Sequence, residues 1–286
     1  MSIVYLNGQF VPQAEARVSV MDRGFLFADG AYELVPVYSR RPFRLAEHLR
    51  RLQHTLDALR IPNPRTDAEW TDLIHDLVAR NAPDDQSIYL QVTRGADVRR
   101  DHAFPLVVQP TVFMLSSPLV TPGAEVRARG IAARTASDIR WLRCDLKTLA
   151  LLANCLLKQE GLDAGCAETI LLRDGFLSEG TASNIFVVRQ GRLLTPPKSH
   201  LMLAGITYDV VLELAARHGM PHEVREIAER ELRTADELWM TSSTREVLAI
   251  TSLDGQPVGD GRPGPMAAQM YDWYQTFKNE VMRRGH

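Results

Sequence analysis

The four lysines of this chain are the first residues to consider as chemical groups, because arginine supplies almost all of its other positive charge. A lysine amine can carry a carbonyl compound as a Schiff base when apolar or cationic surroundings keep it uncharged. Lys147 stands in the apolar stretch WLRCDLKTLALLA, whereas Lys158, Lys198 and Lys278 lie among polar, proline or charged residues. This pattern selects Lys147 as the candidate nucleophile. The alternative is that it pairs with Asp145 or extends to the surface.

Two segments could hold an anion such as a phosphate group. The sequence AGIT at 204–207 leads into a predicted helix over 207–218, and the free N–H groups and dipole at a helix start favour negative charge. The sequence TSST at 241–244 follows a predicted strand and offers hydroxyl groups. Each segment also has a simpler interpretation, since Thr207 can cap its helix and the second segment can be an ordinary turn.

Composition restricts the partners of the chain. Its net charge of −2 and lack of a long basic run do not favour nucleic acid, and no segment reaches the roughly 18 apolar residues of a membrane span. The first ten residues lack the pattern of a secretory signal, so we expect a cytoplasmic protein with small-molecule ligands. Cys144, Cys155 and Cys166 show no metal-binding spacing and are interpreted as buried, reduced thiols, with no metal expected.

Mixed helices and strands are predicted in the first part of the chain. Asn7-Gly8 suits a two-residue hairpin turn between alternating apolar and polar residues. Leucines spaced by three and four predict an amphipathic helix over 45–60, with Arg50 and Arg51 on opposite flanks. Strands are predicted around 88–92 and over 111–117.

The helix and strand patterns are all interrupted at 117–125, which predicts a linker. We place a domain boundary near Pro122. The length of 286 residues also favours two domains, 1–121 and 122–286, of which the second would carry Lys147. The expected elements of the second domain are a buried, apolar helix over 146–162, strands at 168–172, 184–188 and 237–241, and a helix over 207–218 that ends at Gly219 and Pro221.

Six sequence blocks, in this order, resemble the class IV pyridoxal-phosphate aminotransferases, and among them the D-amino-acid aminotransferases. The blocks are DRGFLFADGAYE at 22–33, EHLRRL at 47–52, DIRWLRCDLK at 138–147, SEGTASNIF at 178–186, AGIT at 204–207 and TSST at 241–244. The resemblance implies an α/β fold of two domains, fold type IV, with the cofactor between them. It also implies a homodimer in which the 99–105 loop serves the partner's active site.

The cofactor implied by the resemblance is pyridoxal 5'-phosphate. Lys147 would carry it as a Schiff base, and Glu179 would face the pyridine nitrogen, keeping it protonated so that the cofactor acts as an electron sink. An arginine fork and hydroxyl groups suit the phosphate. The residues implied for the phosphate are Arg51, Ile206, Thr207 and Ser243, with Ser242 nearby.

Substrate recognition is implied for the segment RRDHAFP at 99–105. Its Arg100 and His102 resemble an Arg-x-His pair that receives the substrate carboxylate in D-amino-acid aminotransferases, and Tyr32 resembles the third contact. The loop is one residue longer than the common family pattern, so Arg99 could take the place of Arg100. Ala182 is a further departure, because serine is frequent there.

The function that these implications predict is a transaminase. It would move the amino group of a D-amino acid of the D-alanine or D-glutamate type to a 2-oxo acid such as 2-oxoglutarate, in a ping-pong cycle. The alternatives within the class are a branched-chain L-amino-acid aminotransferase, an (R)-amine transaminase and 4-amino-4-deoxychorismate lyase. A non-enzymatic alternative is an inactive relative that binds vitamin B6.

Overall fold

The computed structural model describes residues 2–284, and the chain divides into two compact units. Within the described residues, unit 1 holds residues 2–119, the segment Leu146–Leu151 and residues 281–284. Unit 2 holds Val120–Asp145 and Leu152–Glu280. The division after Leu119 falls close to Pro122, although independent folding of the two parts stays a prediction.

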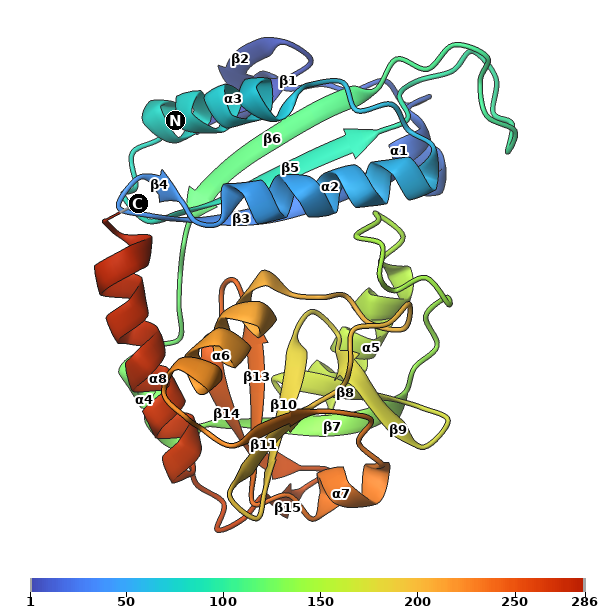
Figure 1. Cartoon of the computed structure of the whole chain (residues 1–286). Coiled ribbons are helices and arrows are strands. Elements are labelled where there is room, and N and C mark those ends of the chain that lie inside the picture. Colours follow the sequence, from blue (N-terminus) through green and yellow to red (C-terminus); the bar gives the residue numbers. More distant parts are fainter. Residues whose placement is uncertain (1, 285–286) are drawn as a thin grey trace. The chain divides into compact units, whose positions relative to one another are not determined.

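Unit 1 is built on an antiparallel sheet, which within the described residues has the strand order β2-β1-β6-β5-β3-β4 (Figure 1). The helices α2 and α3 pack on it. The strands are β1 Ile3–Leu6, β2 Gln9–Pro12, β3 Gly30–Tyr38, β4 Arg41–Pro42, β5 Gln86–Thr93 and β6 Thr111–Pro118. The helical segments are η1 Gln13–Glu15, α1 Arg23–Phe27, α2 Leu45–Leu59 and α3 Asp67–Arg80.

Local sequence signals in unit 1 are confirmed. Asn7 and Gly8 both have positive φ, at 47° and 99°, as a tight hairpin turn between β1 and β2 requires. The leucine stripe of α2 is buried in the core together with residues of α3 and the sheet. Burying these side chains stabilises the unit by about 1.5–3 kcal/mol each.

Unit 2 contains a larger mixed sheet, whose order in the part of the chain described is β12-β11-β10-β13-β14-β7-β8-β9, with β15 paired to β14. Its strands are β7 Ile131–Ser137, β8 Glu168–Arg173, β9 Phe176–Gly180, β10 Asn184–Arg189, β11 Arg192–Thr195, β12 His222–Val224, β13 Glu237–Ser242, β14 Glu246–Leu253 and β15 Gln256–Pro257. The helices are α4 Ala124–Arg129, α5 Leu152–Asp163, α6 Ile206–Arg217, α7 Glu229–Arg233 and α8 Pro265–Phe277, which continues as the π-helical segment η2 Lys278–Met282. The strands predicted at 168–172, 184–188 and 237–241 and the helix predicted at 207–218 are confirmed.

The helix predicted over 146–162 begins only at Leu152. The segment before it is held against β3 instead, because Tyr32 N–H donates to the Lys147 carbonyl and Leu149 N–H donates to the Gly30 carbonyl, each at 3.0 Å. These contacts group Lys147 with unit 1, whereas the sequence assigned it to the second domain, and those domain bounds stay a prediction.

The helix α5 is also less buried than its apolar composition predicted. Leu152 and Leu156, one turn apart, are 74% and 52% exposed, and Cys155 between them is exposed. The opposite side packs against β8, where a Cβ on Gly161 would lie 2.5 Å from Thr169 Oγ1. Burial was therefore predicted wrongly for this face and for Cys155. Cys144 and Cys166 are buried as predicted.

In residues 2–284 no helix is long and apolar enough to cross a membrane. The same residues contain no group of three or more histidine, cysteine, aspartate or glutamate side chains arranged to hold a metal ion.

Candidate active site

Lys147 is fixed by backbone contacts on both sides. Its N–H donates to Thr55 Oγ1 at 3.2 Å, and its carbonyl accepts from Tyr32 N–H. Its ammonium lies 4.1 Å from the centroid of the Tyr32 ring. A lysine whose main chain is fixed by α2 and β3 presents its amine in a restricted volume, as a covalent cofactor linkage requires.

The other three lysines have partners within unit 2. Lys158 donates to a backbone carbonyl, and Lys198 forms an ion pair with a carboxylate of α6. Lys278 was predicted to lie in a charged tail, but it is only 9% exposed and its Nζ lies 2.6 Å from Glu246 Oε1. This buried position corrects the prediction, and the Lys278 amine is engaged by the buried Glu246 carboxylate. These contacts leave Lys147 as the candidate for the reactive amine.

Arg51, the predicted phosphate ligand, forms a buried ion pair with Glu33. Its Nε and Nη2 lie 2.7 and 2.8 Å from the two carboxylate oxygens. His48, from the same face of α2, places its Nδ1 2.8 Å from Glu33 Oε2. Burial raises the pKa of Glu33, but the Arg51 and His48 contacts outweigh burial and bring it well below its usual range. Burial lowers the pKa of His48, so the neutral ring donates through Nδ1–H.

The Glu33 contact changes what a mutation of Arg51 is expected to do. Arg51→Ala removes a phosphate ligand and also leaves the buried Glu33 carboxylate without its charged partner. Cofactor affinity should fall roughly tenfold or more, and the free energy of unfolding should fall by about 3–5 kcal/mol. Fluorescence titration and urea unfolding measure the two effects.

The matched control is the double variant Glu33→Gln, Arg51→Ala. It should recover much of the stability, because the buried charge is gone, and it should not recover cofactor affinity. Full recovery of affinity in the double variant would show that Arg51 does not bind the phosphate.

The predicted substrate loop is anchored by Arg23, which sequence reasoning did not select. Arg23 is 3% exposed and donates to the carbonyl oxygens of residues 101–103, while its Nε lies 2.8 Å from Asp29 Oδ2. Asp29 also accepts two hydrogen bonds from Arg94. Arg23 could have been selected from the sequence, because it lies in the block at 22–33 that carries the resemblance. The loop backbone is therefore tied to a buried charge network.

Arg100 and His102, the predicted carboxylate contacts, share Phe27 as a neighbour. The Arg100 guanidinium carbon lies 4.9 Å from the Phe27 ring centroid, and the His102 ring centroid lies 5.3 Å from it. Both side chains are exposed on the loop. Their neighbouring positions are consistent with joint binding of one carboxylate, which stays a prediction for Arg100 and its alternative Arg99.

Glu179, predicted to face the pyridine nitrogen, lies at the end of β9 and is 4% exposed. It accepts hydrogen bonds from Arg140 Nη1 at 2.5 Å, from Leu203 N–H at 3.2 Å to each oxygen and from Asn184 Nδ2 at 3.4 Å. Sequence reasoning did not select Arg140 or Asn184. Both lie in blocks that carry the resemblance, at 138–147 and 178–186, and that position was the only signal for them.

A second acid competes with Glu179 for Arg140. Asp138 accepts hydrogen bonds from Arg140 Nε and Nη2, both at 2.9 Å. It also forms an ion pair with Arg173 at 3.0 Å. Burial raises the pKa of Glu179 to about 7, although Arg140 acts in the opposite direction. Burial also raises the pKa of Asp138, but the arginine contacts bring it below its ordinary value. Even with Arg140 as a partner, Glu179 therefore titrates near pH 7.

This raised pKa predicts how the stability of the cofactor-free protein depends on pH. The folded state binds the Glu179 proton more tightly than the unfolded state, so this contribution is full below pH 4.5 and is lost as the pH rises through 7. Its size is up to about 3 kcal/mol. The Tm difference between the wild type and Glu179→Gln, measured without cofactor from pH 4 to 8, should shift against the wild type as the pH rises. A pH-independent difference would show that Glu179 is already ionised.

The start of α6 is the predicted anion site, and no side chain caps this end of the helix. Gly205 is the N-cap residue, and α6 begins at Ile206, which places Thr207 inside the first turn. The capping interpretation of Thr207 is therefore wrong. A Cβ on Gly205 would lie 2.3 Å from Asn184 Oδ1, so only glycine permits this close approach. The first N–H groups of α6 are suited to an anion.

The turn after β13 supplies hydroxyl groups, as predicted. Ser242 Oγ accepts the N–H of Arg245 at 3.1 Å and so shapes the turn, and Ser243 follows it. Thr241 Oγ1 is buried and has no hydrogen-bond partner among the described residues. A buried hydroxyl without a partner is costly unless a ligand completes it. The start of α6 and the hydroxyl groups at the end of β13 are each suited to a phosphate group, and their joint role stays a prediction.

A comparison with protein families identifies the chain. Residues 30–253 match the family described as amino-transferase class IV. The chain belongs to the class IV aminotransferases. This family depends on pyridoxal 5'-phosphate, and a reactive lysine, a buried acid and an anion-binding helix start are the groups such a cofactor needs.

Sequence relatives of this class IV aminotransferase include D-alanine aminotransferases. That of Bacillus licheniformis is 40% identical over 263 residues, which cover 92% of each chain. That of Listeria monocytogenes is 36% identical over 98% of this chain and 96% of its own.

Solved structures that resemble the chain include branched-chain amino acid aminotransferases. The Escherichia coli protein superposes with a TM-score of 0.91 at 27% identity, covering 98% of this chain and 96% of its own. The T.th. protein with pyridoxamine 5'-phosphate has a TM-score of 0.91 at 28% identity, covering 99% of this chain and 95% of its own. The mixed α/β fold is that of the family.

Proposed function

We propose that this class IV aminotransferase transfers the amino group of a D-amino acid to a 2-oxo acid such as 2-oxoglutarate. The observation that carries the proposal is the anchored 99–105 loop, in which Arg100 and His102 share one neighbour. The 40% identity to a D-alanine aminotransferase over 92% of both chains supports it independently.

Lys147 is the catalytic base and acid in this proposal. Bound pyridoxal 5'-phosphate supplies an electron sink for the bond that breaks at the substrate Cα. Lys147 Nζ holds the cofactor until substrate arrives, and the freed amine then removes the Cα proton and delivers a proton later in the half-reaction. The fixed backbone of Lys147 and the Tyr32 ring beneath its ammonium restrict where that amine can move.

Binding of the cofactor is assigned to Glu179, Arg51, the start of α6 and the end of β13 with the turn that follows it. Glu179 holds the proton of the ring nitrogen, and the Arg140 contact keeps the carboxylate oriented. Arg51 supplies charge for the phosphate, oriented by its two contacts with Glu33. The remaining phosphate contacts are the start of α6 at Ile206 and Thr207, with Ser242 at the end of β13 and Ser243 in the turn that follows it.

Enantiomer choice follows from where the substrate carboxylate is held. If Arg100, His102 and Tyr32 fix the carboxylate on one side, only one enantiomer directs its Cα–H bond toward Lys147. The other enantiomer would have to exchange the positions of its side chain and its hydrogen. We assign the D-enantiomer to this geometry.

A panel of D- and L-amino acids with 2-oxoglutarate tests the proposal. D-Alanine or D-glutamate should react fastest, and the L-enantiomers should be poor substrates. The rival is a branched-chain L-amino-acid aminotransferase, favoured by the TM-score of 0.91 to such structures. Faster turnover of L-leucine than of any D-amino acid would select that rival.

A homodimer is part of the proposal. Leu152 and Leu156 expose an apolar face of α5, and Leu106 and Val107 of the long loop are also exposed, as surfaces covered by a second copy would be. Light scattering should give twice the mass of 32.1 kDa. We also propose a cytoplasmic location, which the free thiols support, and small-molecule partners only.

A further inference from the structure

The turn that follows β13 ends at Glu246, the first residue of β14, which has an unusual backbone geometry. The turn consists of residues 243–245, and Ser242 pairs with Glu246 across it. Glu246 has a φ of 56°, in the left-handed region that glycine adopts most easily. A charged, long side chain at this position is therefore not explained by the turn itself.

The side chain of Glu246 is buried and tied to the C-terminal helix. Glu246 is 1% exposed. Its Oε1 lies 2.6 Å from Lys278 Nζ, and its Oε2 accepts a hydrogen bond from Gln275 Nε2 at 2.8 Å. Both carboxylate oxygens are thus engaged by the end of α8 and the residue that follows it. A buried carboxylate with such partners has one favourable position.

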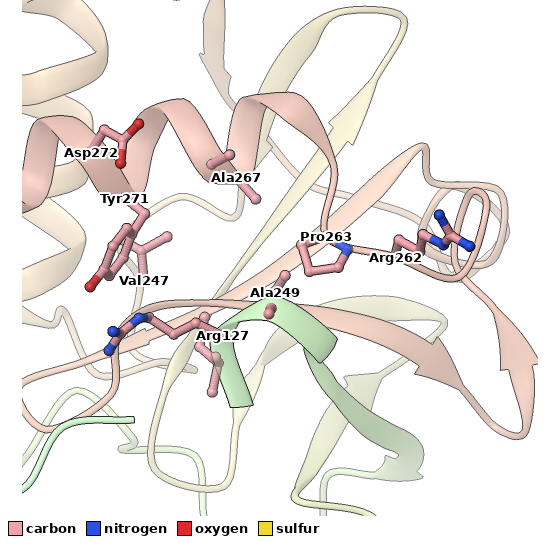
Figure 2. Close-up of a pocket in the computed structure, with 11 residues that line it drawn as sticks. Arg127, Val247, Ala249, Arg262, Pro263, Ala267, Tyr271 and Asp272 are labelled. Atoms are coloured by element: carbon pink, nitrogen blue, oxygen red, sulfur yellow. The ribbon is translucent and has the colours of Figure 1, made fainter. Parts of the chain in front are cut away.

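Apolar packing next to this contact is incomplete. A cavity of about 420 Å³ lies between α4, β14 and α8, and Figure 2 shows Val247, Ala249 and Ala267 around it. Tyr271, one turn before Gln275, lines the same cavity, and the Arg127 guanidinium lies 5.0 Å from its ring. The polar contacts of Glu246 with α8 therefore lie beside this cavity, at the first residue of β14.

We propose that Glu246 is a positioning residue, which through Lys278 and Gln275 sets the turn that presents Ser242 and Ser243 to the cofactor phosphate. The inference rests on the proposed phosphate role of that turn. The left-handed backbone of Glu246 fixes the direction in which the chain leaves the turn. The buried ion pair with Lys278 fixes the position of Glu246. Loss of the anchor lets the turn move and weakens binding of the phosphate group alone.

The test compares two ligands that differ only in the phosphate. The cofactor-free full chain is titrated with pyridoxal 5'-phosphate and with pyridoxal, for the wild type and Glu246→Gly. Glycine accepts the left-handed backbone, so the variant should fold. Its Kd for pyridoxal 5'-phosphate should rise about tenfold, as the loss of one charge-assisted hydrogen bond would cause, while the Kd for pyridoxal changes less than about twofold. Lys278→Met, which removes the anchor from the helix side, should give the same selective loss.

Asp254→Gly is the matched control. Asp254 is another acidic residue with a left-handed φ, 50°, and it lies directly after β14, at the end opposite Glu246. It also accepts hydrogen bonds, from Thr135 and Arg233. A purely structural effect of losing such an anchor would lower Tm in both glycine variants. Of the two glycine variants, only Glu246→Gly should change the ratio of the Kd for pyridoxal 5'-phosphate to the Kd for pyridoxal.

Ser243→Ala separates the inference from the proposed function. A selective loss of phosphate affinity in Ser243→Ala, without one in Glu246→Gly and Lys278→Met, would overturn the positioning role alone. No selective loss in Ser243→Ala would overturn the phosphate role of the turn. An equal loss for both ligands in Glu246→Gly would also contradict the positioning role.

Discussion

Replacing Lys147 with alanine is expected to lower kcat by about 10⁴-fold, because the variant loses the group that moves the Cα proton and also the covalent attachment of the cofactor. The main-chain contacts with Thr55 and Tyr32 do not involve the lysine side chain, so the fold should be retained. Steady-state kinetics with the preferred D-amino acid and 2-oxoglutarate measure the effect, and circular dichroism checks the fold.

Lys158→Ala is the control for this variant. Lys158 lies on α5 and donates to a backbone carbonyl. Its removal should change kcat less than about twofold, as for most surface substitutions. If Lys147→Ala retained more than about one hundredth of the wild-type kcat, general acid–base catalysis by this residue would be excluded.

Replacing Arg100 with alanine is expected to lower kcat/KM for D-alanine or D-glutamate about 100-fold. Two charge-assisted hydrogen bonds to the carboxylate, of about 1.5 kcal/mol each, would be lost. The absorbance of the bound cofactor should stay unchanged, because this residue is not assigned to the cofactor. The effect should appear mainly as a higher KM if the carboxylate is bound equally in the ground state and the transition state.

Arg99→Ala decides the register of the longer loop. The backbone of residues 101–103 is held by Arg23 in either case, so both variants should keep the loop in place. Arg99→Ala should leave kcat/KM nearly unchanged. A damaging Arg99→Ala with a harmless Arg100→Ala would move the assignment by one residue. If both were harmless and an (R)-amine or L-leucine reacted fastest, D-specificity would be wrong and class IV membership would remain.

The elements that sequence predicted correctly are those whose signal is local. The leucine spacing of α2 and the Asn7-Gly8 turn express helix and turn geometry directly, and both appear where expected. The helix predicted for the segment before α5 is absent for a physical reason. Its residues favour a helix by composition, but hydrogen bonds to β3, which is distant in sequence, hold it in another conformation.

The site was predictable only where the family pattern named a residue. Resemblance selected Lys147 and Glu179, while Arg140, which contacts Glu179, was missed because a buried arginine has no local signal. Lys278 was misplaced for the same reason, since its partner Glu246 lies 32 residues away. Such pairs appear only when the strands and helices that carry them are packed.

The most direct measurement of the central claim, that Lys147 holds the cofactor, is reduction with borohydride followed by peptide mapping. Protein loaded with pyridoxal 5'-phosphate is reduced, digested and examined by mass spectrometry. The mass of the reduced cofactor should appear on the peptide that contains Lys147 and on no other. Its appearance instead on Lys158, Lys198 or Lys278 would contradict the claim.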